Sequence, residues 1–374
     1  MMTNDQPQPY ELEISVFGKG LGECIAVHYG DGNWAIVDSF IEDKLKEPIA
    51  LQYLKNIGVE AKTAVRFILA THWHSDHIRG LPALVDHCDE ATFVCSSAYT
   101  TNTFFRMIEA YKTNGFLDDS KLRDLYDTFK ILSERRKIKS GIFKYVLEDT
   151  CIVRLPLTNG LQAEIWALSP SSTRQQQALE EIASLFDDSA ADLPLVPLQN
   201  ENDLSVAAWV RVGTAISLLG ADLEESGNPD EGWSAVIASQ ARPTEPGSNY
   251  KVSHHGSITG HHDEIWSSLL TASPVVAITP FSRLRNPLPI KRDAARILSY
   301  TSAAYLASRP QFRQGERLSG TTRKIVAHIS RTRPFYELGH IRMRADGRAA
   351  NPVWSVVTSG GANLLSKEVS QLFD

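Results

Sequence analysis

The chain has 374 residues, of which 43% are hydrophobic, so it is long and apolar enough to bury a large core. It contains no apolar run near the ~20 residues that a membrane helix needs, and its first residues lack the basic and apolar regions of a signal peptide. The formal net charge of −6 is unevenly distributed, because residues 283–348 hold 13 Arg and two Lys against four acidic residues. These features exclude a membrane-spanning protein and predict one surface suited to anions, although the arginines could instead pair internally with the acidic remainder.

The first part of the chain alternates short strands with helices. Residues 1–9 are expected to form an unstructured tail. Strands are predicted over residues 12–17, 24–29, 34–38 and 65–71, and helices over residues 49–57 and 81–88. Pro48 and Gly58 bracket the first of these helices. This alternation predicts α/β layers.

The remainder continues the pattern around a polar, helical stretch at residues 97–143, whose basic end at residues 135–139 we interpret as a solvated helix end. Further strands are predicted over residues 161–167, 204–212, 275–279, 324–329, 340–344 and 353–357, with a helix over 291–300. We expect one domain spanning residues 1–374, with 97–143 as a helical insertion and 283–374 as a basic C-terminal part.

The most informative segment follows the strand at 65–71. It reads His72-Trp73-His74-Ser75-Asp76-His77 and presents three imidazoles and a carboxylate within six residues. Neutral imidazole and ionised carboxylate are ligands that zinc and similar divalent ions prefer. His72 and His74 can therefore bind one ion, while Asp76 and His77 can bind a second one close by.

Several ordered motifs resemble the metallo-β-lactamase superfamily. They are Trp34 to Asp38, Thr71 to His77, Leu218 to Asp222 and Lys251 to Ser257. The paired histidines before Gly256, together with Gly18 to Glu23 and Asn202 to Ser205, are most similar to the ComEC-type hydrolase domain and its soluble relatives. The resemblance covers roughly residues 11 to 280 and implies a four-layer αββα sandwich.

The resemblance also implies roles for individual residues. His72 and His74 would bind metal one, Asp76 and His77 metal two, and Asp222 would bridge them. We favour His255 over His254 as the last ligand, which leaves His254 next to the substrate with a catalytic role beside Asp76. Asp38 would brace the histidine loop. The implied cofactor is Zn²⁺, as one or two ions, with Mn²⁺ as the alternative.

Two departures from the superfamily pattern affect the site. Residues 88–222 contain no histidine, so the usual third imidazole of metal one is absent, and water, Ser169 or Asn202 could complete that position. Arg79 stands where relatives carry glycine. We assign Arg79 and Ser257 to substrate binding, because a guanidinium can grip a phosphate bidentately, although Arg79 could equally cap a neighbouring loop.

The resulting functional prediction is a hydrolase that attacks its substrate with a metal-activated water. A phosphodiesterase or nuclease acting on nucleic acid or a nucleotide fits the basic segment best. Hydrolysis of a lactone, thioester or β-lactam, or a non-catalytic role with a protein partner in a defence or DNA-processing complex, are the alternatives. The four cysteines form no Cys-x-x-Cys pair, which favours reduced thiols and a cytoplasmic location.

Overall fold

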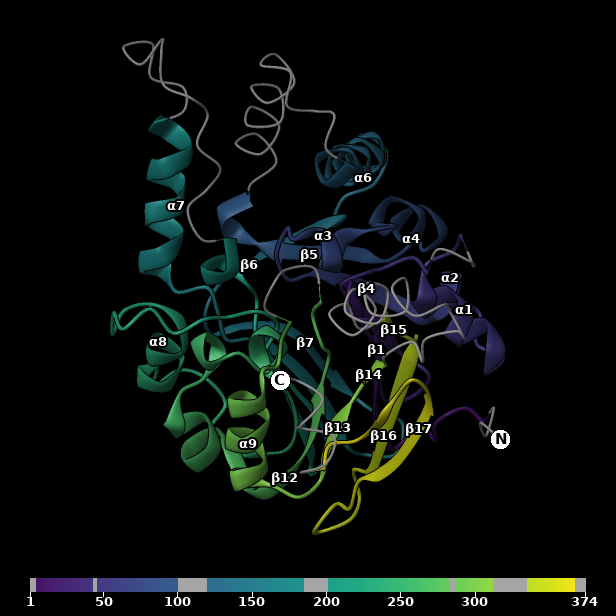
Figure 1. The fold of residues 1–374 in the computed structure, drawn as a ribbon. Helices are drawn as coiled ribbons and strands as arrows, with labels where there is room; N and C mark the ends of the chain where they lie inside the picture. The colour runs from purple at the N-terminus through teal and green to yellow at the C-terminus, as the bar shows by residue number, and fades with distance from the viewer. Residues whose placement is uncertain are drawn as a thin grey trace, which may run out of the picture.

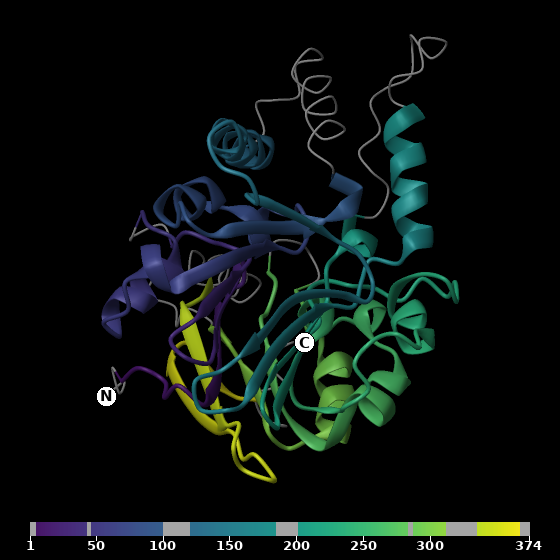
Figure 2. The ribbon, with the colours of Figure 1, turned by 180° about the vertical axis from the view of Figure 1, so that it is seen from behind.

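The computed structural model describes residues 5–42, 46–99, 120–184, 201–282, 287–311 and 335–366. Two eight-stranded sheets lie against each other, and helices cover the outer side of each (Figures 1 and 2). None of the helices in these ranges is long and apolar enough to cross a membrane.

The first sheet is antiparallel in its first half and parallel in its second. Its order is β17 (Ser355–Gly360), β16 (Gly339–Asp346), β1 (Glu11–Gly18), β2 (Glu23–Tyr29), β3 (Trp34–Val37), β4 (Val65–Ala70), β5 (Thr92–Ser96) and β6 (Phe143–Val146). Parallel pairing runs from β3 to β6. The helices on its side are α1 (Ile49–Asn56), α2 (Ala61–Ala64), α3 (Ser75–Ile78), α4 (Leu81–His87) and α6 (Ser120–Arg136).

The second sheet has the same mixed character. Its order is β18 (Asn363–Leu364), β13 (Ala304–Leu306), β12 (Leu270–Ile278), β11 (Gly247–Lys251), β10 (Ala215–Leu219), β9 (Ala208–Val212), β8 (Gln162–Ala167) and β7 (Thr150–Pro156). Strands β10 to β13 are parallel. The helices α7 (Ser172–Ser184), α8 (Gly232–Ala238) and α9 (Lys291–Tyr300) lie on its side, and β14 (Pro310–Gln311) pairs with β15 (Phe335–Tyr336) in a small separate sheet.

Three apolar clusters separate these layers. One lies between the two sheets and is built from alternate residues of strands such as β1, where Leu12, Ile14 and Val16 are fully buried. The other two lie between each sheet and its own helices. An inner core flanked by two outer ones is the αββα sandwich, so the predicted fold class is confirmed.

Two local predictions were wrong. Residues 5–9 do not form a free tail, because the Asp5 carboxylate lies 2.7 Å from Nη1 of Arg344 and 3.2 Å from Nη1 of Arg342 in β16. The strand predicted over residues 204–212 begins only at Ala208, since residues 201–204 form a 3₁₀ turn. Two of the arginines in the basic segment are thus used for internal pairing.

The helical insertion predicted over residues 97–143 contains α6, and Arg135 near its end donates to the carbonyl oxygen of Val85 in α4 at 2.7 Å. Phe143 already belongs to β6. Residues 100–119, and the strand predicted over 324–329, lie outside the described residues.

Candidate metal centre

The histidine loop is anchored by a buried carboxylate. Asp38, which follows β3, accepts hydrogen bonds from the backbone N–H of Thr71 and from its hydroxyl, both at 2.8 Å. Its Oδ2 also lies 2.7 Å from Nδ1 of His77. Burial raises the pKa of Asp38, and His77 opposes that rise. The predicted bracing position of Asp38 is therefore what the structure shows, and it turns Nε2 of His77 inward.

The second sheet supplies the opposite wall of the site. Asp222 follows β10, and His254 and His255 follow β11 in a turn where both histidines have positive φ, at 44° and 54°. A side chain at Gly220 would clash with the backbone of Ser253, at 2.8 Å from its nitrogen, so glycine allows these two loops to pack together. Left-handed backbone at non-glycine residues is strained, and such strain concentrates at functional sites.

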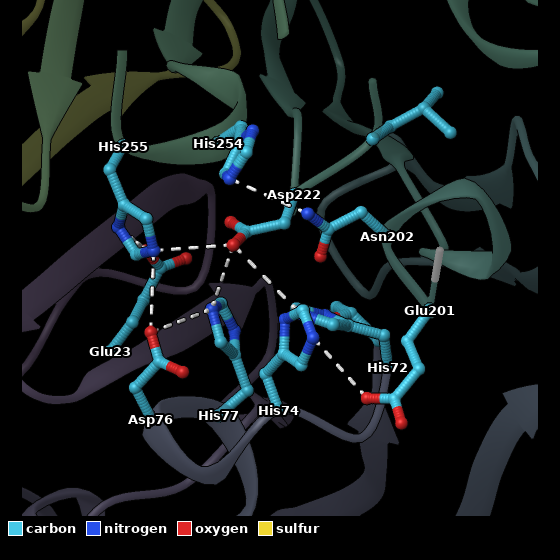
Figure 3. Close-up of polar contacts among 12 residues, drawn as sticks. Glu23, His72, His74, Asp76, His77, Glu201, Asn202, Asp222, His254 and His255 are labelled. Atoms are coloured by element: carbon cyan, nitrogen blue, oxygen red, sulfur yellow. Dashed lines mark hydrogen bonds and ion pairs between the residues drawn. The ribbon is translucent and has the colours of Figure 1, made fainter. Parts of the chain in front are cut away.

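These loops bring four polar side chains into contact (Figure 3). Nε2 of His255 lies 3.2 Å from Oδ2 of Asp222 and 3.3 Å from Oδ2 of Asp76. Nε2 of His77 lies 3.4 Å from Oδ2 of Asp222 and 3.6 Å from Oδ2 of Asp76. All four residues are at most 7% exposed. The structure thus places His255, and not His254, among the predicted ligands.

A second group shares the same carboxylate. Nε2 of His72 lies 3.9 Å from Oδ2 of Asp222 and 3.1 Å from Nδ1 of His74. Ligand atoms of His72, His77 and Asp222 come within 4.8 Å of one another, as do those of Asp76, His77 and His255. Asp222 and His77 thus both contact the two groups, whereas none of the groups found in the described residues includes His74. The bridging role of Asp222 and the pairing of His72 with His74 on one ion stay predictions.

The electrostatics of the cluster favour added positive charge. Burial alone lowers the pKa of His255, but Asp222 and Asp76 together raise it to about 9. For Asp76, burial is outweighed by His77 and His255, which lower its pKa to about 2. Burial, aided by His77 and His74, keeps the pKa of His72 well below its usual value. The carboxylates thus remain ionised and draw cations toward them.

The donor atoms also fit a metal. Oδ2 of Asp76, Nε2 of His77 and Oδ1 of Asp222 are buried without a hydrogen-bond partner. Buried polar atoms are normally hydrogen-bonded, so three such atoms in one cluster fit a site whose donors a cation would complete. Imidazole and carboxylate are donors that suit zinc or manganese.

A buried ion pair supports the site from behind, and the sequence analysis gave it no role. Nζ of Lys251 lies 2.5 Å from Oε2 of Glu23, and both side chains are at most 1% exposed. Glu23 also accepts a hydrogen bond from the Thr279 hydroxyl, and its Oε2 lies 3.8 Å from Nδ1 of His255. Nδ1 of His255 donates to the Thr279 carbonyl oxygen at 3.0 Å. Only the run of polar residues at strand ends could have hinted at this pair.

The remaining predicted residues, His254, Arg79 and Ser257, lie outside the cluster of four. His254 is half-buried, and its Nδ1 lies 2.6 Å from Oε1 of Glu224. Arg79 follows α3 and is exposed. The Ser257 hydroxyl accepts from the backbone N–H of Thr259 at 3.3 Å and caps its own turn. The substrate-binding roles of Arg79 and Ser257 stay predictions.

Comparison with known proteins gives the site a family context. Residues 18–139 match the family model described as the metallo-beta-lactamase superfamily. This segment is therefore similar to that superfamily. Members of the superfamily are generally metal-dependent hydrolases, and the predicted enzyme class is confirmed at that level. No curated protein matches the chain.

Solved structures are similar only in part. The metallo-beta-lactamase SMB-1 bound to 2-mercaptoethanesulfonate is 13% identical, with a TM-score of 0.35, over 67% of this chain and 80% of that one. Rubredoxin oxygen:oxidoreductase from Desulfovibrio gigas is 11% identical, with a TM-score of 0.28, over 59% of this chain and 41% of that one. A metallo-beta-lactamase from Pontibacter korlensis is 13% identical, with a TM-score of 0.26, over 56% of this chain and 67% of that one. Similarity at this level does not indicate a substrate.

Proposed function

We propose that this superfamily hydrolase is a phosphodiesterase of the ComEC type that acts on nucleic acid or a nucleotide. The observation that carries the proposal is the position of Asp222 between two groups of buried donors. Two cations separated by one carboxylate are the arrangement with which many phosphatases and nucleases stabilise the oxygens of an in-line displacement. His72, His74, Asp222 and an additional donor would hold one ion, and Asp76, His77, His255 and Asp222 the other.

Bound divalent cations would supply Lewis acidity and make a water nucleophilic near neutral pH. Residues of the chain would then transfer the protons. As the water oxygen forms a bond to phosphorus, its proton passes to the carboxylate of Asp76. The bond from phosphorus to the leaving oxygen breaks, and that oxygen takes a proton from Nε2 of His254 in its imidazolium form. The part-exposed Nε2 gains this proton from solvent, because in the resting site it accepts from the Asn202 amide. Glu224 fixes the tautomer, because it accepts the hydrogen bond from Nδ1.

The rim determines where the substrate enters. His72, His77 and His255 are closed off from solvent, whereas His74 and His254 are part-exposed, with side-chain exposures of 34% and 18%. An extended polyanion can therefore reach the centre from the side of His74 and His254. Arg79, Arg283 and Arg285 would contact its phosphates, whereas Arg342 and Arg344 of the basic segment pair internally.

The proposal is tested with a substrate panel. The full chain, loaded with Mn²⁺ or Zn²⁺, is assayed on bis-p-nitrophenyl phosphate, single- and double-stranded DNA and RNA, a lactone, a thioester and a chromogenic β-lactam. We expect turnover of the phosphodiesters only, and unchanged turnover in His87→Ala, since His87 is exposed on α4. Turnover of another ester class, or of no substrate in the panel, contradicts the proposal.

We also propose a cytoplasmic location. The cysteines Cys24, Cys88, Cys95 and Cys151 are all free thiols, as is usual in a reducing compartment. Fractionation of cells that express the protein, with detection in the soluble cytoplasmic fraction, tests this proposal. A role inside a larger defence or DNA-processing complex would instead show as co-purifying proteins whose binding survives Asp76→Ala.

A further inference from the structure

The donor that completes the first metal position is the open question left by the sequence, because residues 88–222 contain no histidine. The candidates that the sequence offers are Ser169, which follows β8, and Asn202, in the turn before β9. Their hydrogen bonds distinguish them.

Ser169 is already fully used. Its hydroxyl donates to the carbonyl oxygen of Ser205 at 2.6 Å and accepts from the backbone N–H of Ala207 at 2.8 Å. The side chain is 1% exposed. These bonds tie the end of β8 to the segment that precedes β9, so Ser169 is a structural residue.

Asn202, in contrast, has a side-chain oxygen that accepts no hydrogen bond. Its Nδ2 donates to Oε1 of Glu224 at 2.9 Å and lies 3.4 Å from Nε2 of His254, which occupies both amide protons. Its Oδ1 is buried and has no hydrogen-bond partner, and the residue is 7% exposed. Rotating the amide would set the oxygen against the Glu224 carboxylate, so the hydrogen bonds fix which atom faces the site.

The oxygen is directed at the first metal position. In Figure 3 the Asn202 side chain turns Oδ1 toward the imidazoles of His72 and His74. Nε2 of His74 lies 3.3 Å from Oε2 of Glu201, on the side away from the centre. A carboxylate that binds one ring nitrogen of a histidine orients the other ring nitrogen toward the metal. Here Glu201 binds Nε2 of His74, and Nδ1 of His74 faces inward, 3.1 Å from Nε2 of His72.

We propose that Oδ1 of Asn202 replaces the absent histidine as a ligand of the ion held by His72 and His74, and that this position selects Mn²⁺ over Zn²⁺ more than a three-histidine position does. The inference rests on the two-ion site of the proposed function. Its chemical basis is that carbonyl and carboxylate oxygens suit manganese, whereas zinc prefers nitrogen and sulfur donors. Glu201 and Glu224 act as positioning residues, because each holds a neighbour of the ion and neither faces it.

The test measures metal binding and needs no substrate. The full chain is stripped of metal and titrated with Mn²⁺ and Zn²⁺ by calorimetry, with Mn²⁺ occupancy followed by electron paramagnetic resonance. The wild type should bind two ions. In Asn202→Ala, one of the two binding events should weaken by about 10-fold or more while the other is unchanged. In Asn202→His, which restores an imidazole, the preference at that position should shift toward Zn²⁺ by a similar factor.

Asn159→Ala, at an exposed position between β7 and β8, is the matched control and should bind both ions as the wild type does. The unchanged second binding event shows that each variant is folded. Wild-type affinities at both positions in Asn202→Ala, or an unaltered metal preference in Asn202→His, would overturn this inference and leave the phosphodiesterase proposal standing. A wild type that binds no ion would overturn both.

Discussion

The two halves of the site hold their histidines in different ways. His77 and His255 are buried, and each is fixed through Nδ1 by a buried oxygen, from Asp38 or from the Thr279 carbonyl group. His74 and His254 are part-exposed, and each is held by a part-exposed glutamate. One half is therefore held in place before any ion or substrate arrives, while the other stays accessible.

The difference has a physical cause. The rigid half lies where loops from both sheets close over it, and the buried pair of Glu23 and Lys251 fixes its back wall. The accessible half is bounded by the turn at residues 201–204 and by the strained turn at His254. We therefore expect the rigid half, which includes Asp76, to determine how tightly metal binds. The accessible half should determine which metal binds and how protons are transferred.

The largest expected effect comes from removing a donor of the rigid half. Asp76→Ala should lower hydrolysis by about 100-fold or more, since even changes to residues behind metal ligands cost 10–100-fold. The melting temperature should change little, because the Asp76 carboxylate, in the first turn of the short helix α3, faces the polar cluster and not an apolar core. Asp230→Ala, at an exposed position, serves as the control. Full activity in Asp76→Ala would show that the site is wrongly assigned.

The buried pair should matter for stability. Lys251→Met leaves the Glu23 carboxylate buried without its cation, and breaking such a pair costs about 3–5 kcal/mol of unfolding free energy. The double variant Glu23→Gln/Lys251→Met should recover part of that loss. Denaturant unfolding of the metal-free proteins measures both. If the single variant unfolds at the wild-type midpoint, the pair does not support the rigid half.

The adjacent histidines should separate metal binding from proton transfer. His255→Ala should weaken the binding of one ion by about 10-fold or more. His254→Ala should retain both ions but lose activity, and its pH–rate profile should lose the limb of the general acid. Inductively coupled plasma mass spectrometry after dialysis gives the metal content. Equal metal loss in both variants would contradict the separation.

The stability of the metal-free protein should depend on pH through His255 of the rigid half. The pKa of His255 is raised from 6.5 to about 9, so its contribution to stability is complete below about pH 6.5 and is lost as the pH rises through 9. The melting temperature of metal-free protein should therefore fall by several degrees between pH 6.5 and 9. His255→Gln should flatten this slope. A slope that persists in His255→Gln assigns the titration to another group.

The smallest expected effect is on the affinity for nucleic acid. Phe281 stacks on His255 with ring centroids 5.1 Å apart, so Arg283 and Arg285 follow the site closely along the chain, although they lie outside the described residues. Arg283→Glu/Arg285→Glu should weaken nucleic-acid binding alike for all sequences, and should reduce the slope of log affinity against log salt by about two. Fluorescence anisotropy across a salt series measures this. If these arginines pair internally, the melting temperature falls and the slope is unchanged.

Local sequence determined much of the fold. The helix at α9 matches its predicted bounds, and β2 to β4 match within one residue at each end, because glycines and prolines punctuate clear apolar runs there. Strands β5, β6, β7 and β11 were not predicted. Their short runs become strands only through pairing with neighbours that are distant in sequence.

The sequence by itself also determined the histidine loop, since its donors lie within six residues and their chemistry points to a divalent ion. Only the tertiary structure decided which of His254 and His255 faces inward, that Lys251 pairs with Glu23, and that Asn202 turns its oxygen toward the site. The physical reason is that these contacts join residues up to about 230 positions apart, whose approach depends on how two sheets pack. Side-chain direction in such contacts is set by packing and hydrogen bonding, which local sequence does not encode.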